Sequence, residues 1–191
     1  MKRKGLFTLL LLGGMTTMVA LLWAEELLSK DEAIAQAFPK PIAVEMKMAA
    51  VSSGQIERIS KTLGVADVPR VLKYYEATTN GVIVGYALIN RVQGKHGPIT
   101  FLVAMDSAMA IDSVSILALK EQRGRLVRRR SFLSQFTGKK MPDKMRVHSD
   151  IRGITGATIS SRAVASGVRR AVACMTVVLE GSKDGEDGEE K

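Results

Sequence analysis

The feature that most constrains this chain is an uncharged run of 20 residues at positions 5–24. About 20 apolar residues are enough for a helix to cross a lipid bilayer. The run follows Lys2, Arg3 and Lys4 and precedes two glutamates, and a positively charged flank normally stays in the cytoplasm. We therefore expect one N-terminal transmembrane helix, with the rest of the chain on the periplasmic or extracytoplasmic side of the cytoplasmic membrane.

A cleaved signal peptide is the other interpretation of this N-terminus. Cleavage after Ala24 would place Leu22 at a position that normally holds a small residue. The sequence therefore favours an uncleaved anchor, and both interpretations export the part of the chain that follows.

The remaining length allows one domain of ordinary size with short extensions. We divide the chain into an anchor or signal at 1–24, a helical lead-in at 25–66, a domain at 67–179 and a disordered acidic tail at 180–191. The tail holds six acids and two bases, so the rest is more basic than the net charge of +9 indicates. Nucleic acid is still not an expected partner, because aromatic residues make up only 5% and no nucleic-acid-binding motif accompanies the charge.

Cysteine and histidine are scarce in this chain. Cys174 is its only cysteine, and the two histidines, His96 and His148, lie far apart in the sequence. One cysteine cannot form an internal disulfide or a two-cysteine metal site. We therefore expect no metal site made by this chain alone, and we interpret Cys174 as a small packed residue.

Two short helices are predicted early in the exported part. The first covers residues 32–38, with Ser29 or Asp31 as its N-cap and prolines after its end. The second begins at Ser52 or Ser53 and stops at Gly64, since glycine commonly ends helices.

A sheet is predicted in the middle of the chain, where the hydrophobic period changes from helical to alternating. The first two strands flank Thr79-Asn80-Gly81, and Asn-Gly is the strongest short signal for a β-hairpin. Four segments are expected to be strands: 71–78, 82–92, 98–105 and 111–119. The predicted fold is α+β, an antiparallel sheet of about four strands covered by helices on one side.

Three further segments follow the predicted sheet. A basic turn occupies residues 121–130, and a short helix covers 131–136. The last helix is predicted at roughly 159–179. Its apolar residues recur at helical spacing, at Val164, Val168, Ala171, Val172, Met175 and Leu179.

The segment at residues 153–162, GITGATISSR, carries the chemistry that we expect. Its small residues allow close backbone approach, and Thr155 and Thr158 supply hydroxyls just before the last helix. Free N–H groups and the helix dipole make such a junction a natural phosphate site, to which Arg162 could add a cation. The simpler interpretation is a helix cap made by Thr158, Ser160 or Ser161, and it is compatible with phosphate binding.

The string TGATIS at 155–160 resembles the [S/T]-G-A-T-x-[S/T] attachment motif of the FMN-binding domain family. The family includes the periplasmic G subunit of Rnf-type electron transport complexes, the C subunit of the sodium-pumping NADH:quinone oxidoreductase and small stand-alone flavoproteins. The resemblance covers about residues 30–178. Its other landmarks follow in the same order: VGYA at 84–87, GKHGPITF at 94–101, Lys120-Glu121 with Gly124, and FLSQFTGK at 132–139.

This resemblance implies a covalent cofactor. In the family, a flavin transferase uses FAD and magnesium to join FMN through its phosphate to the second threonine of the motif, which is Thr158 here. The remaining cofactor-binding residues implied by the resemblance lie in the motif and in the turn that the family places by the flavin. They are Thr155, Gly156, Ala157, Ser160, Glu121 and Gly124.

Two departures distinguish this chain from the family pattern. Where the respiratory-complex subunits resemble ETPGLG, residues 121–126 read EQRGRL, which is more similar to the stand-alone members. The family usually has an acid three positions before the first Ser or Thr of the motif, and Arg152 stands there. Asp150 is near but does not occupy the matching position.

The implied function is an exported, membrane-tethered electron carrier, either an electron-transfer flavoprotein or a subunit of a respiratory oxidoreductase, and not a stand-alone catalyst. Its expected partners are the flavin transferase during maturation and redox proteins such as cytochromes or reductase subunits. No side chain is expected to be catalytic. Two alternatives remain: a flavin-binding regulatory module without redox turnover, and a basic membrane-anchored adaptor without flavin.

Overall fold

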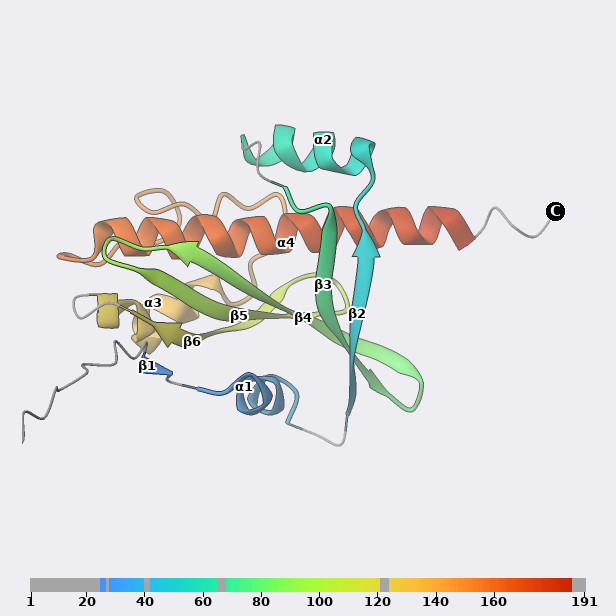
Figure 1. Cartoon of the computed structure of the whole chain (residues 1–191), viewed down its shortest axis with the longest axis horizontal. Helices are drawn as coiled ribbons and strands as arrows, with labels where there is room; N and C mark the ends of the chain where they lie inside the picture. The colour runs from blue at the N-terminus through green and yellow to red at the C-terminus, as the bar shows by residue number, and fades with distance from the viewer. Residues whose placement is uncertain (1–24, 27, 40–41, 65–67, 121–123, 187–191) are drawn as a thin grey trace, which may run out of the picture.

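A computed structural model describes residues 25–26, 28–39, 42–64, 68–120 and 124–186 (Figure 1). The predicted transmembrane segment at 5–24 lies outside these described residues. Within them, no helix combines the length and the apolar character needed to cross a bilayer.

The sheet is antiparallel, and its strands lie in the order β1-β6-β5-β4-β3-β2. The four predicted strands are confirmed to within one residue at each end. The short β1 and the eight-residue β2 were not expected. The strands are β1 (Glu25–Glu26), β2 (Ala43–Ala50), β3 (Val71–Thr79), β4 (Val82–Gln93), β5 (Pro98–Asp106) and β6 (Ile111–Leu119).

Strand β2 was missed because five of its eight residues are alanine, glutamate or lysine, types that are depleted in strands. It forms one edge of the sheet and pairs only with β3. None of its residues is buried, Met46 and Met48 are exposed, and Lys47 pairs with Glu45 at 2.9 Å. The alternation VEMKM at 44–48 is therefore that of an edge strand and does not mark a core-facing side.

Strands β3 and β4 form the predicted hairpin but pair along only part of their length. Asn80 and Gly81 have φ of 51° and 76°, the left-handed values that a two-residue hairpin turn requires. The pairing runs from Thr79↔Val82 to Tyr75↔Ala87. Beyond that point β3 continues beside β2 and β4 continues beside β5, so the two strands diverge (Figure 1).

Four α-helices and two 3₁₀ helices accompany the sheet in the described part of the chain: α1 (Lys30–Ala37), α2 (Ser53–Leu63), η1 (Gly124–Arg128), α3 (Arg130–Leu133), η2 (Ser134–Phe136) and α4 (Thr158–Glu186). Helix α2 matches its prediction, with Ser52 as N-cap and Gly64 in the left-handed conformation at its end. Helix α4 continues past the predicted end at Leu179. The added residues are polar, and a helix that extends beyond its apolar face is not visible in a hydrophobic pattern.

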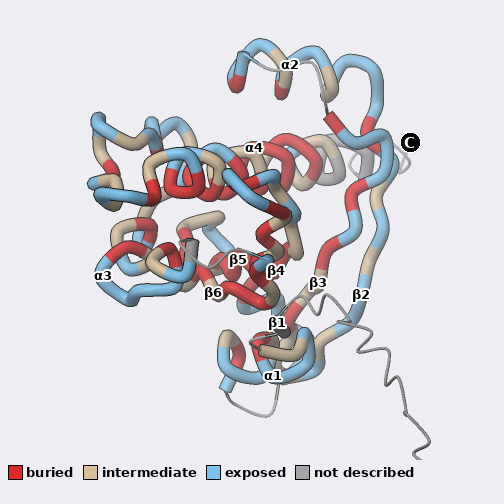
Figure 2. Tube along the Cα trace, turned by 60° about the vertical axis from the view of Figure 1, so that its left-hand side comes forward, coloured by how far each residue is buried: buried red, intermediate tan, exposed pale blue. Residues whose placement is uncertain are grey.

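The helices cover both faces of the sheet, so the expectation of helices on one side is wrong for α1 (Figure 2). Helix α4 lies on one face, with α2 packed against it, and the larger core between α4 and the sheet includes Phe101 and Val168. On the other face, α1 covers a small cluster of Ala33, Phe38 and neighbouring strand residues. Ala33 is the only buried residue of α1, which is too little apolar surface to predict a packing face.

Candidate functional site

The TGAT motif forms a tight turn that leads directly into α4. The Ala157 N–H donates to the Ile154 carbonyl at 3.0 Å, and Gly156 has φ of 83°. A side chain would be strained at this φ, which explains the glycine between the two threonines. Thr158 is the first residue of the helix.

The start of α4 has the properties of an anion site. N–H groups in the first turn of a helix have no intrahelical partner, and the first helical bond here runs from the Ser161 N–H to the Ala157 carbonyl at 2.9 Å. These N–H groups and the dipole of the 29-residue helix favour a bound phosphate. The Thr158 side chain is half-buried, and no hydrogen bond among the described residues uses its hydroxyl.

Two buried serines hold the motif in place. The Ser161 hydroxyl donates to the Ala157 carbonyl at 2.9 Å and accepts from the Ile154 N–H at 3.3 Å, which closes the turn from inside the helix. The Ser160 hydroxyl accepts from the Lys95 N–H at 3.4 Å. The Ser161 hydroxyl therefore closes the turn and does not cap α4, because the N–H from which it accepts lies before the helix, while Ser160 links the motif to another loop.

That loop joins β4 to β5 and brings two family landmarks together. The Gly94 N–H donates to the Gly97 carbonyl at 2.9 Å. A Cβ on Gly97 would lie 2.8 Å from the Lys120 carbonyl, so the loop is packed closely against the end of β6. The GKHG loop at 94–97 thus contacts the motif through Ser160 on one side and Lys120 on the other. These contacts bring the three landmarks together at one place. The predicted neighbour Glu121 lies outside the described residues, and Gly124 begins η1.

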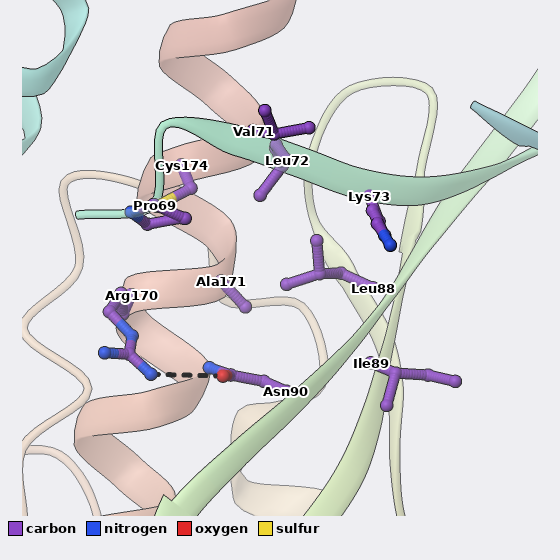
Figure 3. A pocket seen from close by; sticks show the side chains of 10 residues that line it. All are labelled: Pro69, Val71, Leu72, Lys73, Leu88, Ile89, Asn90, Arg170, Ala171 and Cys174. Carbon is purple, nitrogen blue, oxygen red and sulfur yellow. Dashed lines mark hydrogen bonds between the residues drawn. The ribbon is translucent and has the colours of Figure 1, made fainter. Parts of the chain in front are cut away.

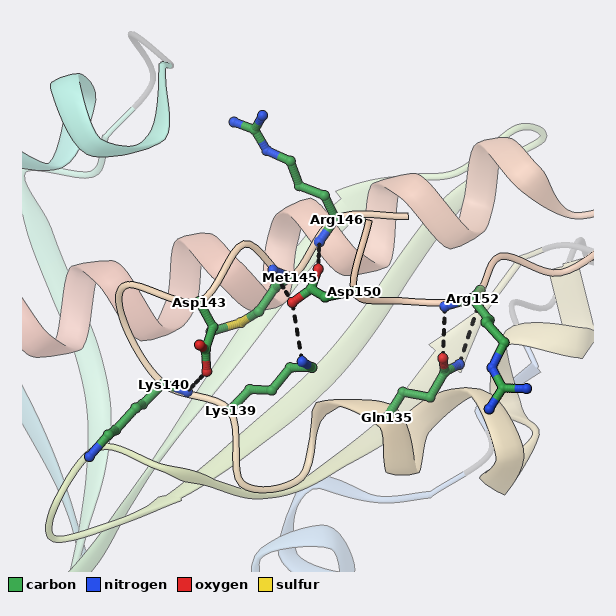
Figure 4. A network of polar contacts seen from close by, with 8 residues as sticks. All are labelled: Gln135, Lys139, Lys140, Asp143, Met145, Arg146, Asp150 and Arg152. Carbon is green, nitrogen blue, oxygen red and sulfur yellow. Dashed lines mark hydrogen bonds and ion pairs between the residues drawn. The ribbon is translucent and has the colours of Figure 1, made fainter. Parts of the chain in front are cut away.

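The lead segment, which we define as residues 145–152, is fixed by Asp150 (Figure 4). The Asp150 carboxylate accepts from the Arg146 and Met145 N–H groups at 2.8 and 2.9 Å, and from Lys139 Nζ at 3.1 Å. Burial raises the pKa of Asp150, but the two backbone hydrogen bonds and Lys139 together outweigh it and lower that pKa. The ionised form of Asp150 is therefore the one that holds the segment.

Gln135 fixes the last residue of the lead segment. Its Oε1 accepts from the Arg152 N–H at 2.7 Å, and its Nε2 donates to the Arg152 carbonyl at 3.2 Å (Figure 4). The Arg152 side chain itself is exposed. The backbone before the motif is therefore held without an acid at position 152. Gln135 lies in the FLSQFTGK landmark, but its contact with Arg152 was not predicted, because it spans 17 residues and leaves no local pattern.

Comparison with known proteins agrees with the resemblance described above. Residues 94–173 match the FMN-binding domain family. The G subunit of the Na(+)-translocating ferredoxin:NAD(+) oxidoreductase complex of Acetobacterium woodii is 27% identical over 158 residues, which cover 78% of this chain and 75% of that protein. The family match points to FMN as the cofactor.

Solved structures share the fold. NqrC of Shewanella oneidensis has a TM-score of 0.55 and 15% identity, over 78% of this chain and 87% of that one. The C subunit of the Na(+)-translocating NADH-quinone reductase of Parabacteroides distasonis has a TM-score of 0.53 and 15% identity, over 78% of this chain and 83% of that one. The α+β architecture is therefore one that these two proteins also have.

The residues present fit the phosphate end of FMN. Thr158 offers a hydroxyl without a described partner, the first turn of α4 offers N–H donors, and Gly156 leaves open space beside them. Arg162 and Lys95 are exposed cations close in sequence to the groups that form the site. The predicted residues Thr155, Ala157 and Ser160 all lie in this turn or in the first turn of the helix.

Proposed function

We propose that this chain is an exported, membrane-tethered flavoprotein that carries FMN on Thr158 and transfers electrons between protein partners. The observation that supports it best is the Thr158 hydroxyl, which stands at the N-terminus of α4 without a hydrogen-bond partner among the described residues. The family match supports the cofactor. A basic adaptor without flavin has no comparable support.

Attachment is a phosphoryl transfer onto Thr158. Its Oγ forms a bond to the phosphorus of the FMN half of FAD, the bond to the AMP phosphate breaks, and AMP leaves with the electron pair. The hydroxyl proton passes to a base or to solvent. A flavin transferase is the proposed catalyst, and the first-turn N–H groups of α4 would stabilise the anionic phosphodiester that results.

During turnover the chain holds the cofactor and does no covalent chemistry. Bound FMN supplies one- and two-electron redox chemistry, which the surrounding protein tunes. Thr158 reacts once, during maturation, and Glu121 and Gly124 are proposed to lie beside the flavin ring. The similar protein from Acetobacterium woodii is part of an oxidoreductase complex, so we propose reductase subunits or cytochromes as the partners.

The proposed location rests on residues 5–24. As a transmembrane anchor behind Lys2, Arg3 and Lys4, this run would leave the domain outside the cytoplasm. A covalent link would then retain FMN where a lost cofactor could not be recovered from the cytoplasmic pool. A reporter that is active only in the cytoplasm should stay silent when it is fused after Lys191, and strong activity would contradict this topology.

The decisive experiment is the substitution Thr158→Val. Chain co-produced with a flavin transferase and exported should give a fluorescent flavin band on a denaturing gel, because unfolding does not break a covalent bond. Its mass should exceed that of the unmodified chain by FMN less one water. Valine keeps the branched shape of threonine but has no oxygen for the ester, so the band should disappear completely while the thermal midpoint stays nearly unchanged.

Thr155→Val is the matched control, because it removes a hydroxyl from the same turn. It should weaken the band less, since Thr155 would only orient the motif. A band that persists in Thr158→Val would move the attachment to Ser160 or Ser161. Wild-type chain that stays unlabelled beside an active transferase would contradict covalent attachment and favour a non-covalent flavin module.

A further inference from the structure

A groove runs between β4 and α4, on the side of α4 that faces β3. Its first half is a hollow of about 380 Å³, lined by residues 91–93 of β4 and by α4 from Ala163 to Arg170. Its second half is a hollow of about 350 Å³, lined by residues 88–90 of β4 and by α4 from Arg170 to Cys174 (Figure 3). Arg170 lines both halves, so we treat them as one site, the β4–α4 groove.

The first half of the groove is cationic. Its charged lining consists of Arg91, Arg169 and Arg170, and no acid occurs among the described residues that line it. Gln93 and Ser166 add neutral polar groups. Three positive charges lining one hollow attract an anion.

Arg169 supplies a second, independent indication of an anion. Its Nη2 donates to the Thr62 carbonyl at 2.8 Å, but its Nε is buried and has no hydrogen-bond partner among the described residues. A buried donor without a partner is costly, and because this Nε has almost no accessible surface, an anion in the groove would meet the other guanidinium nitrogens. A carboxylate or phosphate oxygen is the acceptor that a guanidinium prefers. Burial lowers the pKa of Arg169, as does the nearby Arg146, against a smaller opposing effect of Asp150.

The second half of the groove results from the divergence of β3 and β4, and most residues that line it are apolar, with Lys73 as its one cation besides the shared Arg170 among the described lining residues. Leu72 of β3 and Leu88 of β4 form its walls where the two strands no longer pair, and Ala171 and Cys174 of α4 form its floor (Figure 3). Asn90 marks the boundary with the cationic half. Its Oδ1 accepts from Arg170 Nη2 at 3.1 Å, and its Nδ2 donates to the Gly167 carbonyl at 2.9 Å.

We propose that the β4–α4 groove binds an amphiphilic anion, with a carboxylate or phosphate head against Arg91, Arg169 and Arg170 and an apolar body in the gap between β3 and β4. Apolar walls with a few converging polar groups are typical of small-molecule sites, and the two volumes are of the usual size. The charge of the first half and the apolar lining of the second determine this class of ligand.

The cationic end of the groove is separate from Thr158, because Arg169 lies 11 residues later, about 16 Å along the helix axis. The near end of the groove, at Gln93 and Ala163, adjoins the loop and the helix turn of the proposed flavin site. The test below measures protection of Cys174 and not flavin attachment, so its outcome is distinguishable from that of the Thr158 experiment.

Cys174 provides a reporter for the test, because it is the only cysteine and lines the apolar half. Burial raises the pKa of its thiol to about 11, so its reaction with iodoacetamide should be slow and sensitive to whatever fills the groove. With the full chain in lipid nanodiscs, hexanoate or hexyl phosphate should slow this reaction in a saturable way. Hexanol should require about tenfold higher free concentration, since it lacks the charge that the arginines bind, and inorganic phosphate should not protect the thiol.

Arg169→Gln should raise the hexanoate concentration for half-protection about tenfold and leave that of hexanol unchanged. Arg130→Gln is the matched control, with the same charge change at an exposed site, and should behave as wild type. Arg91→Gln tests the head site again if Arg169→Gln fails to fold. Protection by either anion supports the proposal. The anion that protects at the lower concentration shows whether the site prefers a carboxylate or a phosphate head group. Equal protection by hexanol, unchanged hexanoate binding in the folded arginine variants, or no protection by any amphiphile would overturn it.

Discussion

The lead segment and the β4–α4 groove both use polar side chains close to α4, but they use them differently. In the lead segment, Asp150 and Gln135 bond to backbone groups and hold the chain in one conformation. In the groove, a buried nitrogen of Arg169 has no described partner, and the described charged lining has one sign. Polar groups whose hydrogen bonds are all made position the backbone. A donor without a partner can still form a hydrogen bond with a ligand.

The largest loss of stability should follow Asp150→Asn, which removes the charge at the centre of the lead segment. The ion pair with Lys139 is lost, one of the two backbone hydrogen bonds becomes a neutral one, and the other is lost because the amide nitrogen of asparagine cannot accept. We expect the free energy of unfolding to fall by about 1–3 kcal/mol. Chemical denaturation measures this loss, and flavin labelling at limiting transferase should fall with it. An unchanged stability would show that the segment is held by other contacts.

The same carboxylate should make the stability of the wild type depend on acid. The pKa of Asp150 is lowered by folding, so its contribution is complete above the unfolded value of about 3.9 and is lost as pH falls through the lower folded value. The Asp150→Asn variant lacks this group. The stability difference between wild type and variant should therefore shrink as the pH falls below about 4, and a constant difference would contradict the assignment.

Gln135→Ala should have a smaller effect than Asp150→Asn, because the three hydrogen bonds that it removes, two to Arg152 and one to Phe132, involve neutral groups. We expect the free energy of unfolding to fall by about 1 kcal/mol, and the position of Arg152 before the motif to loosen. The neighbouring exposed residue offers a control, since Ser134→Ala should change little. If Gln135→Ala leaves both stability and labelling of Thr158 unchanged, the contact does not position the motif.

The smallest effect on stability should follow replacement of Arg128, Arg129 and Arg130 by glutamine. All three side chains are exposed, and exposed charges contribute little to folding. The thermal midpoint should stay nearly unchanged, whereas binding of an acidic partner should weaken and become less sensitive to salt. A protein that unfolds or fails to accumulate would show that these arginines are structural.

The sequence predicted those parts of the fold that depend on local signals. The hairpin at Asn80-Gly81, the cap at Ser52 and the end at Gly64 each follow from the conformational preference of one or two residues. Strand β2 was missed, because most of its residues are alanine, glutamate or lysine, which are depleted in strands. The side on which α1 packs depends on a few small residues that carry almost no periodic signal.

The candidate site also has one part that local sequence signals predict and another that they do not. A motif at consecutive positions predicted the turn around Thr158. The support from Gln135 and Asp150 depends on how distant segments meet, which no spacing in the sequence records. The arginine cluster of the groove could not be predicted from the sequence either, because Arg91 and Arg169 line one hollow only when α4 lies along β4.

The divergence of β3 from β4 also bears on how the domain opens. Five register pairs join these strands, all at the hairpin end, so β2 and the far half of β3 depend on β4 for little of their backbone bonding. This part of the sheet can exchange its amide hydrogens through local opening, at a free energy below that of global unfolding. Strands β5 and β6 and the start of α4 keep their own contacts during such an event. We therefore expect amide exchange near Thr158 to be little affected by local opening at the opposite end of the sheet.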